Sequence, residues 1–373
     1  MNLTALTKAL TKDHASLRDF LDNNRIYGLS IVSIKEMVID ETITIGTTSN
    51  TLFQAASISK SIFAATIMRL YEKGVIDIYQ DIAAYLDPLT YPTFDGLIYP
   101  VTLYDILTHT AGFNGHGFAG YLHGTQLPTL EEILTGKRPS NSLQLKMIHP
   151  PKTKFMYSGG GFMLAQYILE KITNKSYQDW ADELIFKPLN MHHSTLSMPL
   201  DKNHNHEIAT GWSAYDTPLD QGYVIYPELA AAGLWTTPSD LACFGIEMMK
   251  AYHKKSDFLT SKNAELMMTI PKDIKSEYGL GFHISTVNDH LWFGHGGDNT
   301  GFHSRMAFCP NKESGIIVMV NSDIGDDIPN QILECFIKHM WNSKHLSFSS
   351  GLDLILLHAD PLRGTNKIIK QLI

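Results

Sequence analysis

The sequence has few cysteines, no long apolar run and no basic cluster, and each scarcity excludes a class of protein. Its 373 residues include only three cysteines, which lie far apart at Cys243, Cys309 and Cys335. They are too few for a disulfide framework or a cysteine-rich metal site, and their odd number favours free thiols while leaving room for one disulfide. No stretch approaches the roughly 20 apolar residues of a membrane-spanning helix, so we expect no membrane span.

The charge balance excludes further partners. Thirty basic and 38 acidic residues give a net charge of −8 without a long basic run, so we expect neither nucleic acid nor an anionic membrane surface as a partner. Residues 1–24 lack the long apolar core of a signal peptide. We therefore expect a soluble protein that is cytoplasmic as the sequence stands, or periplasmic if a signal peptide has been removed.

The order of secondary-structure signals predicts the fold class. Strand patterns occur near both ends of the sequence, at residues 28–45 and again between residues 278 and 321, whereas helix patterns with proline-bearing loops fill the middle. The pattern predicts an α/β plus all-α fold, in which an antiparallel sheet flanked by helices receives an inserted helical lobe. We assign residues 1–74 and 203–345 to the α/β lobe and residues 75–202 to a mainly helical lobe. The pattern leaves the structure of the tail, residues 346–373, undefined.

The most informative short motif is Ser57-Ile58-Ser59-Lys60, at the start of a predicted amphipathic helix that ends at Gly74. Lys60 lies about one helical turn after Ser57, on the same face. A lysine amine beside a serine hydroxyl can activate that hydroxyl as a nucleophile, as serine acyl-enzyme hydrolases require. The alternative is structural, because serine often caps helices and lysine is usually a solvated helix residue. The motif needs support from the rest of the chain, because it also occurs by chance.

Other chemically suggestive residues favour structural interpretations. Four histidines lie close in sequence, but they lack a metal-binding helix motif or a cysteine partner, so we predict no metal site and no cofactor. These histidines are His192, His193, His204 and His206. His109 is more typical of a structural hydrogen bonder than of a catalyst, and Asp240 belongs to the start of a helix. The glycine-rich loop of residues 114–124 is expected to overhang the site and shape substrate choice.

Six blocks of sequence together resemble the serine beta-lactamase and penicillin-binding-protein superfamily, most closely its class C branch, which also contains esterases and D-amino-acid-specific peptidases. The resemblance covers roughly residues 25–340, and six blocks in order are far more specific than any single one. The blocks are Phe53 to Lys60, Thr102 to Phe113, Tyr157-Ser158-Gly159, Phe186 to Met191, Ala231 to Leu241, and Gly294-His295-Gly296-Gly297 with Gly301-Phe302.

The resemblance implies roles for particular residues. Ser57 matches the acylated nucleophile, Lys60 the neighbouring amine and Tyr157 the tyrosine of the second motif. The third motif, on a sheet strand, corresponds to His295-Gly296-Gly297. By the same analogy the backbone N–H of Asp298 would join that of Ser57 in stabilising the oxyanion of the tetrahedral intermediate.

Two questions about these residues stay open at the level of sequence. Either Lys60 or Tyr157 can serve as the general base, and we expect them to titrate as a coupled pair. Without the resemblance, Tyr157 would be interpreted as a packed aromatic residue. Gly296 and Gly297 either admit substrate close to the strand or form a simple bulge or turn.

Two departures from the class C pattern bear on substrate choice. Gly159 stands where the second motif ends in asparagine, and His295 stands where the third motif begins with lysine. Gly159 offers no amide to a substrate, and histidine is largely neutral near pH 7. We therefore predict a serine hydrolase that forms an acyl-enzyme on Ser57 with ester or amide substrates, including D-peptides or β-lactams. The alternatives are a true class C beta-lactamase or DD-peptidase, and a catalytically weak binding or scaffold protein. The sequence leaves the natural substrate and the oligomeric state undefined.

Overall fold

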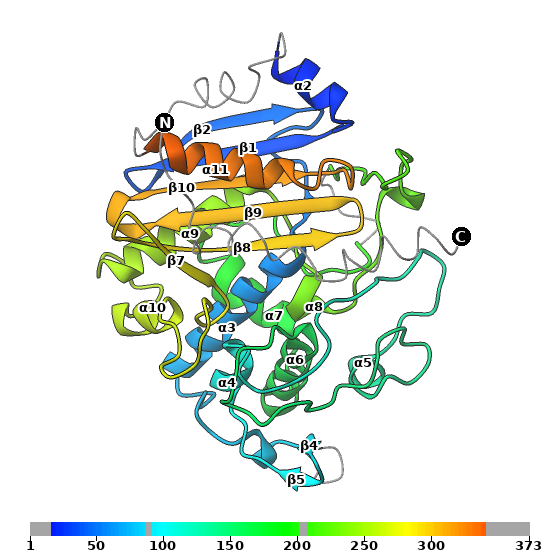
Figure 1. Ribbon diagram of the computed structural model, residues 1–373, viewed down its shortest axis with the longest axis vertical. Helices are drawn as coiled ribbons and strands as arrows, with labels where there is room; N and C mark the ends of the chain where they lie inside the picture. The colour runs from blue at the N-terminus through cyan, green and yellow to red at the C-terminus, as the bar shows by residue number, and fades with distance from the viewer. Residues whose placement is uncertain (1–15, 87–90, 201–206, 341–373) are drawn as a thin grey trace.

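A six-stranded antiparallel sheet forms the centre of the computed structural model, which describes residues 16–86, 91–200 and 207–340 (Figure 1). The strand order is β2-β1-β10-β9-β8-β7, so strands from both ends of the sequence pair at β1 and β10, as the sequence predicts. The strands are β1 (Leu29–Lys35), β2 (Val38–Ile45), β7 (His283–Val287), β8 (His290–Asn299), β9 (Phe302–Cys309) and β10 (Ser314–Val320). The predicted fold class is confirmed.

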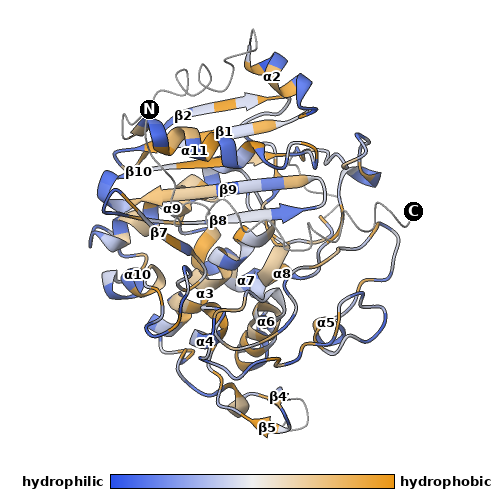
Figure 2. Cartoon of the chain, in the orientation of Figure 1, coloured by the Kyte–Doolittle hydropathy of each residue, from blue (hydrophilic) through white to orange (hydrophobic). Residues whose placement is uncertain are grey.

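Alternating side chains divide β9 between two apolar cores. Met306 and Phe308 pack with helix α9 (Pro238–Tyr252), whereas Ala307 and Cys309 pack with α2 (Leu17–Asn23) and α11 (Ile328–Met340). Successive side chains of a strand point to opposite faces, so the helices cover both faces of the sheet. In Figure 2 the apolar colour follows β10, whereas the end of β8 that lies beside the start of β9 is hydrophilic.

The first apolar core continues from the sheet into the helices that follow α3 (Ser59–Glu72). These helices are α4 (Leu103–Leu107), α5 (Leu130–Thr135), α6 (Gly159–Thr173), α7 (Tyr177–Ala181), a π-helical turn (Asp182–Phe186) and α8 (Leu229–Ala232). Helix α10 (Ser261–Met267) packs beside α9. Two short strand pairs lie outside the main sheet: β3 (Phe53–Gln54) pairs with β6 (Trp235–Thr236), and β4 (Thr93–Phe94) pairs with β5 (Leu97–Ile98). Short 3-10 turns complete the regular structure of the described residues.

The prediction that residues 75–202 are mainly helical is wrong for much of this segment. Irregular chain fills residues 108–129 and 136–158, between the helices. Prolines explain part of the difference, because they lack an N–H donor and interrupt helices. The division of the chain into two lobes stays a prediction, since one apolar core joins these helices to the sheet.

Helix starts follow local side-chain chemistry. The predicted helix near residue 238 begins with Thr237, whose hydroxyl accepts from the N–H of Asp240, and with Pro238 in the first turn. This arrangement satisfies a free N–H and uses the fixed backbone angle of proline. Asp240 is therefore part of a helix start, as predicted. The same logic places Ser158 at the N-cap of α6, directly after Tyr157.

Candidate active site

Ser57 lies in a single 3-10 turn, Ala56–Ile58, that leads into helix α3. Its neighbour Ala56 has a φ of +50°, a left-handed conformation that residues other than glycine seldom adopt. Such strain persists only where the surrounding structure imposes it, and it concentrates at functional sites. The turn leaves Ser57 half-buried, whereas its neighbours on both sides are buried.

Lys60 is buried, with 2% of its surface exposed, and its amine meets the hydroxyl of Ser57. Nζ lies 2.9 Å from Ser57 Oγ and donates a second hydrogen bond of 2.8 Å to the carbonyl of Ala231, which belongs to α8. Among the described residues, Lys60 makes no salt bridge with a carboxylate. Burial therefore acts without compensation and lowers the pKa of Lys60 from 10.5 to about 7.

A lysine with this pKa is partly neutral at physiological pH and can accept a proton. The carbonyl of Ala231 fixes one N–H of the amine, so a neutral Nζ can direct its lone pair toward the Ser57 hydroxyl. Distance and protonation state thus both meet the requirements of a general base. The pairing of Ser57 with Lys60 that the sequence predicts is present in the structure.

Tyr157 approaches the same amine from the segment that precedes α6. Lys60 Nζ lies 5.0 Å from the centre of the Tyr157 ring, a distance at which a cation and an aromatic ring attract one another. The three residues that the sequence singled out are therefore neighbours. The structure brings the tyrosine ring and the serine hydroxyl to the same lysine.

Imidazole and phenol rings surround Tyr157. Their centres lie between 4.3 and 6.4 Å from the centre of its ring. These rings belong to His109, His116, Tyr278, His283 and His295. The histidine-rich shell was missed at the level of sequence, because its members come from separate segments that only the fold brings together. His109 also accepts a 3.1 Å hydrogen bond at Nδ1 from the N–H of Ser158, as expected of a structural hydrogen bonder.

His295, the first residue of the third motif, is 1% exposed and uses both ring nitrogens within the protein. Nδ1 contacts the carbonyl of Gly296, and Nε2 lies 2.9 Å from the hydroxyl of Tyr278. A carbonyl only accepts, so Nδ1 carries a proton. Burial raises the pKa of Tyr278 well above its usual value, so the phenol keeps its proton beside Nε2. A buried ring with both nitrogens bonded inside the protein is a poor partner for a substrate carboxylate.

Gly297 packs directly against the nucleophile turn. A Cβ placed on it would lie 2.0 Å from the carbonyl oxygen of Ala55 and 3.0 Å from the backbone nitrogen of Ser57. Only glycine permits this approach. The alternative of a bulge or turn at residues 297–299 is wrong, since strand β8 runs through Asn299 and the turn follows at Thr300 and Gly301.

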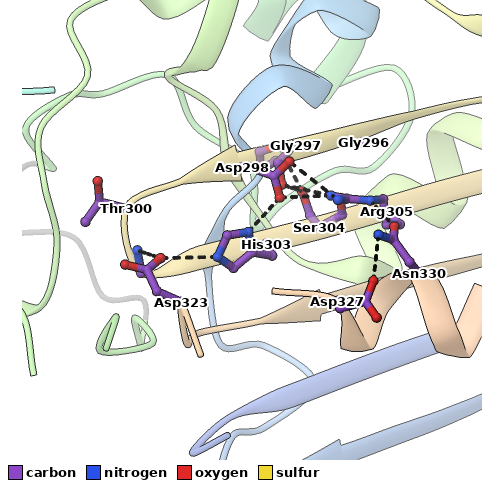
Figure 3. A network of polar contacts seen from close by, with 12 residues as sticks. Gly296, Gly297, Asp298, Thr300, His303, Ser304, Arg305, Asp323, Asp327 and Asn330 are labelled. Carbon is purple, nitrogen blue, oxygen red and sulfur yellow. Dashed lines mark hydrogen bonds and ion pairs between the residues drawn. The ribbon is translucent and has the colours of Figure 1, made fainter. Parts of the chain in front are cut away.

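Asp298 follows Gly297 in β8, and its side chain enters a polar network (Figure 3). Its carboxylate binds Arg305 at 3.1 Å and His303 at 2.6 Å. His303 also contacts Asp323 at 3.2 Å. This network was not predicted from the sequence, although the alternation along β9 places His303 and Arg305 on the same face.

Gly159 lies beneath the loop that follows residue 113, and the geometry explains why no asparagine stands there. A Cβ on Gly159 would lie 2.8 Å from the ring of Phe118 and 3.0 Å from the carbonyl of His116. The N–H of Gly159 donates to that same carbonyl. The loop of residues 114–124 therefore occupies the space of a longer side chain, and its His116 lies next to Tyr157. Its role in substrate choice stays a prediction.

The parts of the chain that the structure describes contain no group of three histidine, cysteine, aspartate or glutamate residues that could hold a metal ion. His204 and His206, two of the four clustered histidines, lie outside the described residues. Among the helices that the structure describes, none combines the length and apolar character needed to cross a membrane.

The fold and the motifs define the class of beta-lactamase-like and penicillin-binding-protein-like hydrolases. The chain belongs to the Beta-lactamase family, whose profile matches residues 17–332. It is similar to unguisins hydrolase ungD of Aspergillus violaceofuscus (strain CBS 115571), with 24% identity over 312 residues that cover 74% of this chain and 53% of the relative. The chain spans about half to three fifths of the length of the curated relatives it matches.

Two solved structures show the same fold. One is an octameric penicillin-binding protein homologue from Pyrococcus abyssi, with a TM-score of 0.74 and 22% identity over 99% of this chain and 82% of that chain. The other is the D-amino acid amidase from Ochrobactrum anthropi SV3 complexed with L-phenylalanine amide, with a TM-score of 0.69 and 20% identity over 91% of this chain and 100% of that chain. At these identities the likeness establishes the fold.

Proposed function

We propose that the protein is a metal-independent serine hydrolase that forms an acyl-enzyme on Ser57 with small ester or amide substrates. The observation that carries the proposal is the buried amine of Lys60, 2.9 Å from Ser57 Oγ, with a pKa lowered to about 7. That amine takes the hydroxyl proton as Ser57 Oγ attacks the substrate carbonyl carbon.

The first half-reaction ends when the leaving group departs. The C–O bond to Ser57 forms, the tetrahedral intermediate collapses, and the proton held by Lys60 passes to the leaving alcohol or amine. Water then attacks the acyl-enzyme and gives its proton to the same base. The bond between the acyl carbon and Ser57 Oγ breaks, the base returns the proton to Oγ, and the acid leaves. Tyr157, whose ring lies next to the amine, is the second group that we propose for these proton transfers.

The oxyanion needs two N–H donors, and the geometry favours those of Ser57 and Asp298. A trans peptide directs its C=O and N–H in opposite directions. The carbonyl of Gly297 accepts from Arg305 at 3.3 Å and from the Ser304 hydroxyl at 3.4 Å, both in β9. The N–H of Asp298 therefore points away from β9, toward the edge of β8 that β7 leaves uncovered beyond Gly294.

Two features favour substrates other than β-lactams. The loop above Gly159 fills the space of an asparagine that could contact a substrate amide, and a lysine cation is replaced by the buried His295, whose ring nitrogens both bond inside the protein. Esters and small amides need neither contact. The Ochrobactrum amidase forms a complex with L-phenylalanine amide, which supports including amino acid amides among the substrates to test.

The test combines turnover with labelling. Purified protein is assayed with a short-chain nitrophenyl ester, D- and L-amino acid amides, a D-peptide and a chromogenic cephalosporin, and is treated with a fluorophosphonate. We expect ester or amide turnover and a mass increase on the peptide that contains Ser57. Ser57→Ala should abolish both, whereas Ser61→Ala, which removes a nearby hydroxyl bonded to Gly281, should retain both.

Fast cephalosporin turnover without ester or amide cleavage would instead identify a true class C beta-lactamase. A folded protein that takes no label and turns over no substrate would favour a binding or scaffold protein.

A further inference from the structure

A buried ion-pair network lies behind the strand that lines the proposed oxyanion site. Gly296 and Asp298 share one face of β8, because side chains alternate along a strand, and they pair with Arg305 and His303 of β9. Arg305 is 1% exposed and the side chain of Asp298 is 15% exposed. Gly297 belongs to the opposite face, which meets the Ser57 turn. The network and the nucleophile thus lie on opposite faces of the same short stretch of strand.

One guanidinium nitrogen contacts both sides of the peptide link between residues 297 and 298. Arg305 Nη1 donates to the Gly297 carbonyl at 3.3 Å and to Asp298 Oδ1 at 3.1 Å, while Nη2 lies 3.4 Å from Asp298 Oδ2 (Figure 3). A guanidinium is planar and rigid, so these bonds together restrict rotation of the peptide between them. The Asp298 N–H belongs to that same peptide.

Hydrogen bonds connect the network to residues outside β8 and β9, and these bonds restrict its movement. Arg305 Nε donates to the side-chain oxygen of Asn330 in α11 at 2.6 Å. His303 bridges Asp298 and Asp323, at 2.6 and 3.2 Å. Glycines at positions 296 and 297 make this strand intrinsically flexible, so its peptide orientation depends on external support.

We propose that Asp298 and Arg305 are positioning residues, which fix the peptide between residues 297 and 298 so that its N–H meets the developing oxyanion. This inference rests on the proposed function, because it assumes that an acyl-enzyme forms on Ser57. Neither side chain touches the substrate; each acts through the backbone. Buried ion pairs contribute little net stability compared with apolar packing, which favours a directional role for this one.

The role predicts a specific kinetic signature. Negative charge on the substrate oxygen develops only in the transition state, so a misdirected N–H lowers kcat and leaves KM nearly unchanged. Loss of an oxyanion donor costs about 100- to 1,000-fold, and misplacement of a retained donor should cost about 10- to 100-fold. The affinity for a boronic acid that forms a tetrahedral adduct on Ser57 should fall in parallel with kcat/KM.

The experiment compares Arg305→Gln, Asp298→Asn and the double variant with the wild-type protein. Acylation by a nitrophenyl ester and inhibition by the boronic acid are measured after circular dichroism and thermal melting confirm folding. We expect each single variant to lose about 10- to 100-fold in acylation rate, and the double variant to lose no more than the worse single variant. Asn330→Ala removes the contact of α11 with Arg305, together with the hydrogen bond of Asn330 to Asp327, and provides a milder test should Arg305→Gln fail to fold.

A matched control distinguishes position from stability. Asp240 is also a buried carboxylate, bonded to Ser194 and to the N–H of His193. Asp240→Asn should lower the melting temperature and leave the acylation rate unchanged. If folded Asp298→Asn and Asn330→Ala are acylated at the wild-type rate, or if KM alone changes, the positioning role is refuted while the proposed function stands. A wild-type protein that is never acylated at Ser57 refutes both.

Discussion

Replacing Lys60 with methionine should stabilise the protein at neutral pH, although it removes the proposed catalytic base. The lysine is 2% exposed, and burial lowers its pKa from 10.5 to about 7. Each tenfold change in a dissociation constant corresponds to about 1.4 kcal/mol, so the charged amine costs about 5 kcal/mol of stability below pH 7. Methionine has a similar length and no charge.

The lost hydrogen bonds offset part of this gain. Methionine leaves the Ala231 carbonyl without the 2.8 Å bond that Lys60 donates, which costs about 1–3 kcal/mol. The variant should therefore be more stable than the wild-type protein by about 2–4 kcal/mol near pH 7.

The difference in unfolding free energy between the two proteins should also depend on pH, and the direction of this dependence provides a second test. Between pH 7 and pH 10.5 the unfolded chain keeps a proton on residue 60 that the folded protein has released, so wild-type stability rises with pH over this range. The methionine variant lacks that contribution. Its advantage should therefore shrink by about 3 kcal/mol between about pH 7 and pH 9.5, and groups that titrate alike in both proteins cancel in the difference.

The assay is urea unfolding of both proteins at several pH values, with Lys262→Met on the exposed surface of α10 as a control for loss of a surface cation. A difference in unfolding free energy that stays constant with pH would refute the reasoning, because Lys60 would then keep the same affinity for a proton in the folded and unfolded protein. A methionine variant that is less stable at every pH would show that the hydrogen bonds outweigh the buried charge.

Two further perturbations test the surroundings of the site. Contacts with Asp298 and Asp323 raise the pKa of His303 from 6.5 to about 9. The stability that protonated His303 contributes is therefore complete below about pH 6.5 and is lost as the pH rises through 9. In urea unfolding, His303→Gln should not show this loss of stability at high pH. Gly159→Asn should lower the melting temperature and the rate of ester turnover, because the new side chain meets the ring of Phe118. Adding Phe118→Ala should restore part of both quantities. If neither recovers, the ring is not the obstacle.

The sequence predicted the parts of the fold that local patterns determine. Apolar strands near both ends of the chain, and the threonine and proline that begin α9, carry their own signals. The spacing of Ser57 and Lys60 likewise placed the hydroxyl and the amine one turn apart, and the structure has them in contact. These features depend on short stretches of sequence.

Features that depend on distant segments were not predicted. The histidine shell around Tyr157 and the Asp298 network join segments far apart in sequence, and strand β8 extends through residues whose composition also suits a turn. Pairing with β9 outweighs the turn preference of Gly297-Asp298-Asn299. The irregular chain between helices α4 and α6 was overlooked because its apolar residues pack in the core without forming helices.

The most direct test of the account is the pH dependence of acylation at Ser57. Intact protein is mixed with a fluorophosphonate between about pH 5 and pH 9, and mass spectrometry follows the rate and position of labelling. The account predicts a single label on Ser57, with a rate that rises with pH around a midpoint near 7 as the amine beside it loses its proton. A folded protein that is labelled elsewhere, not labelled at all, or labelled at Ser57 with a rate independent of pH in this range would contradict it.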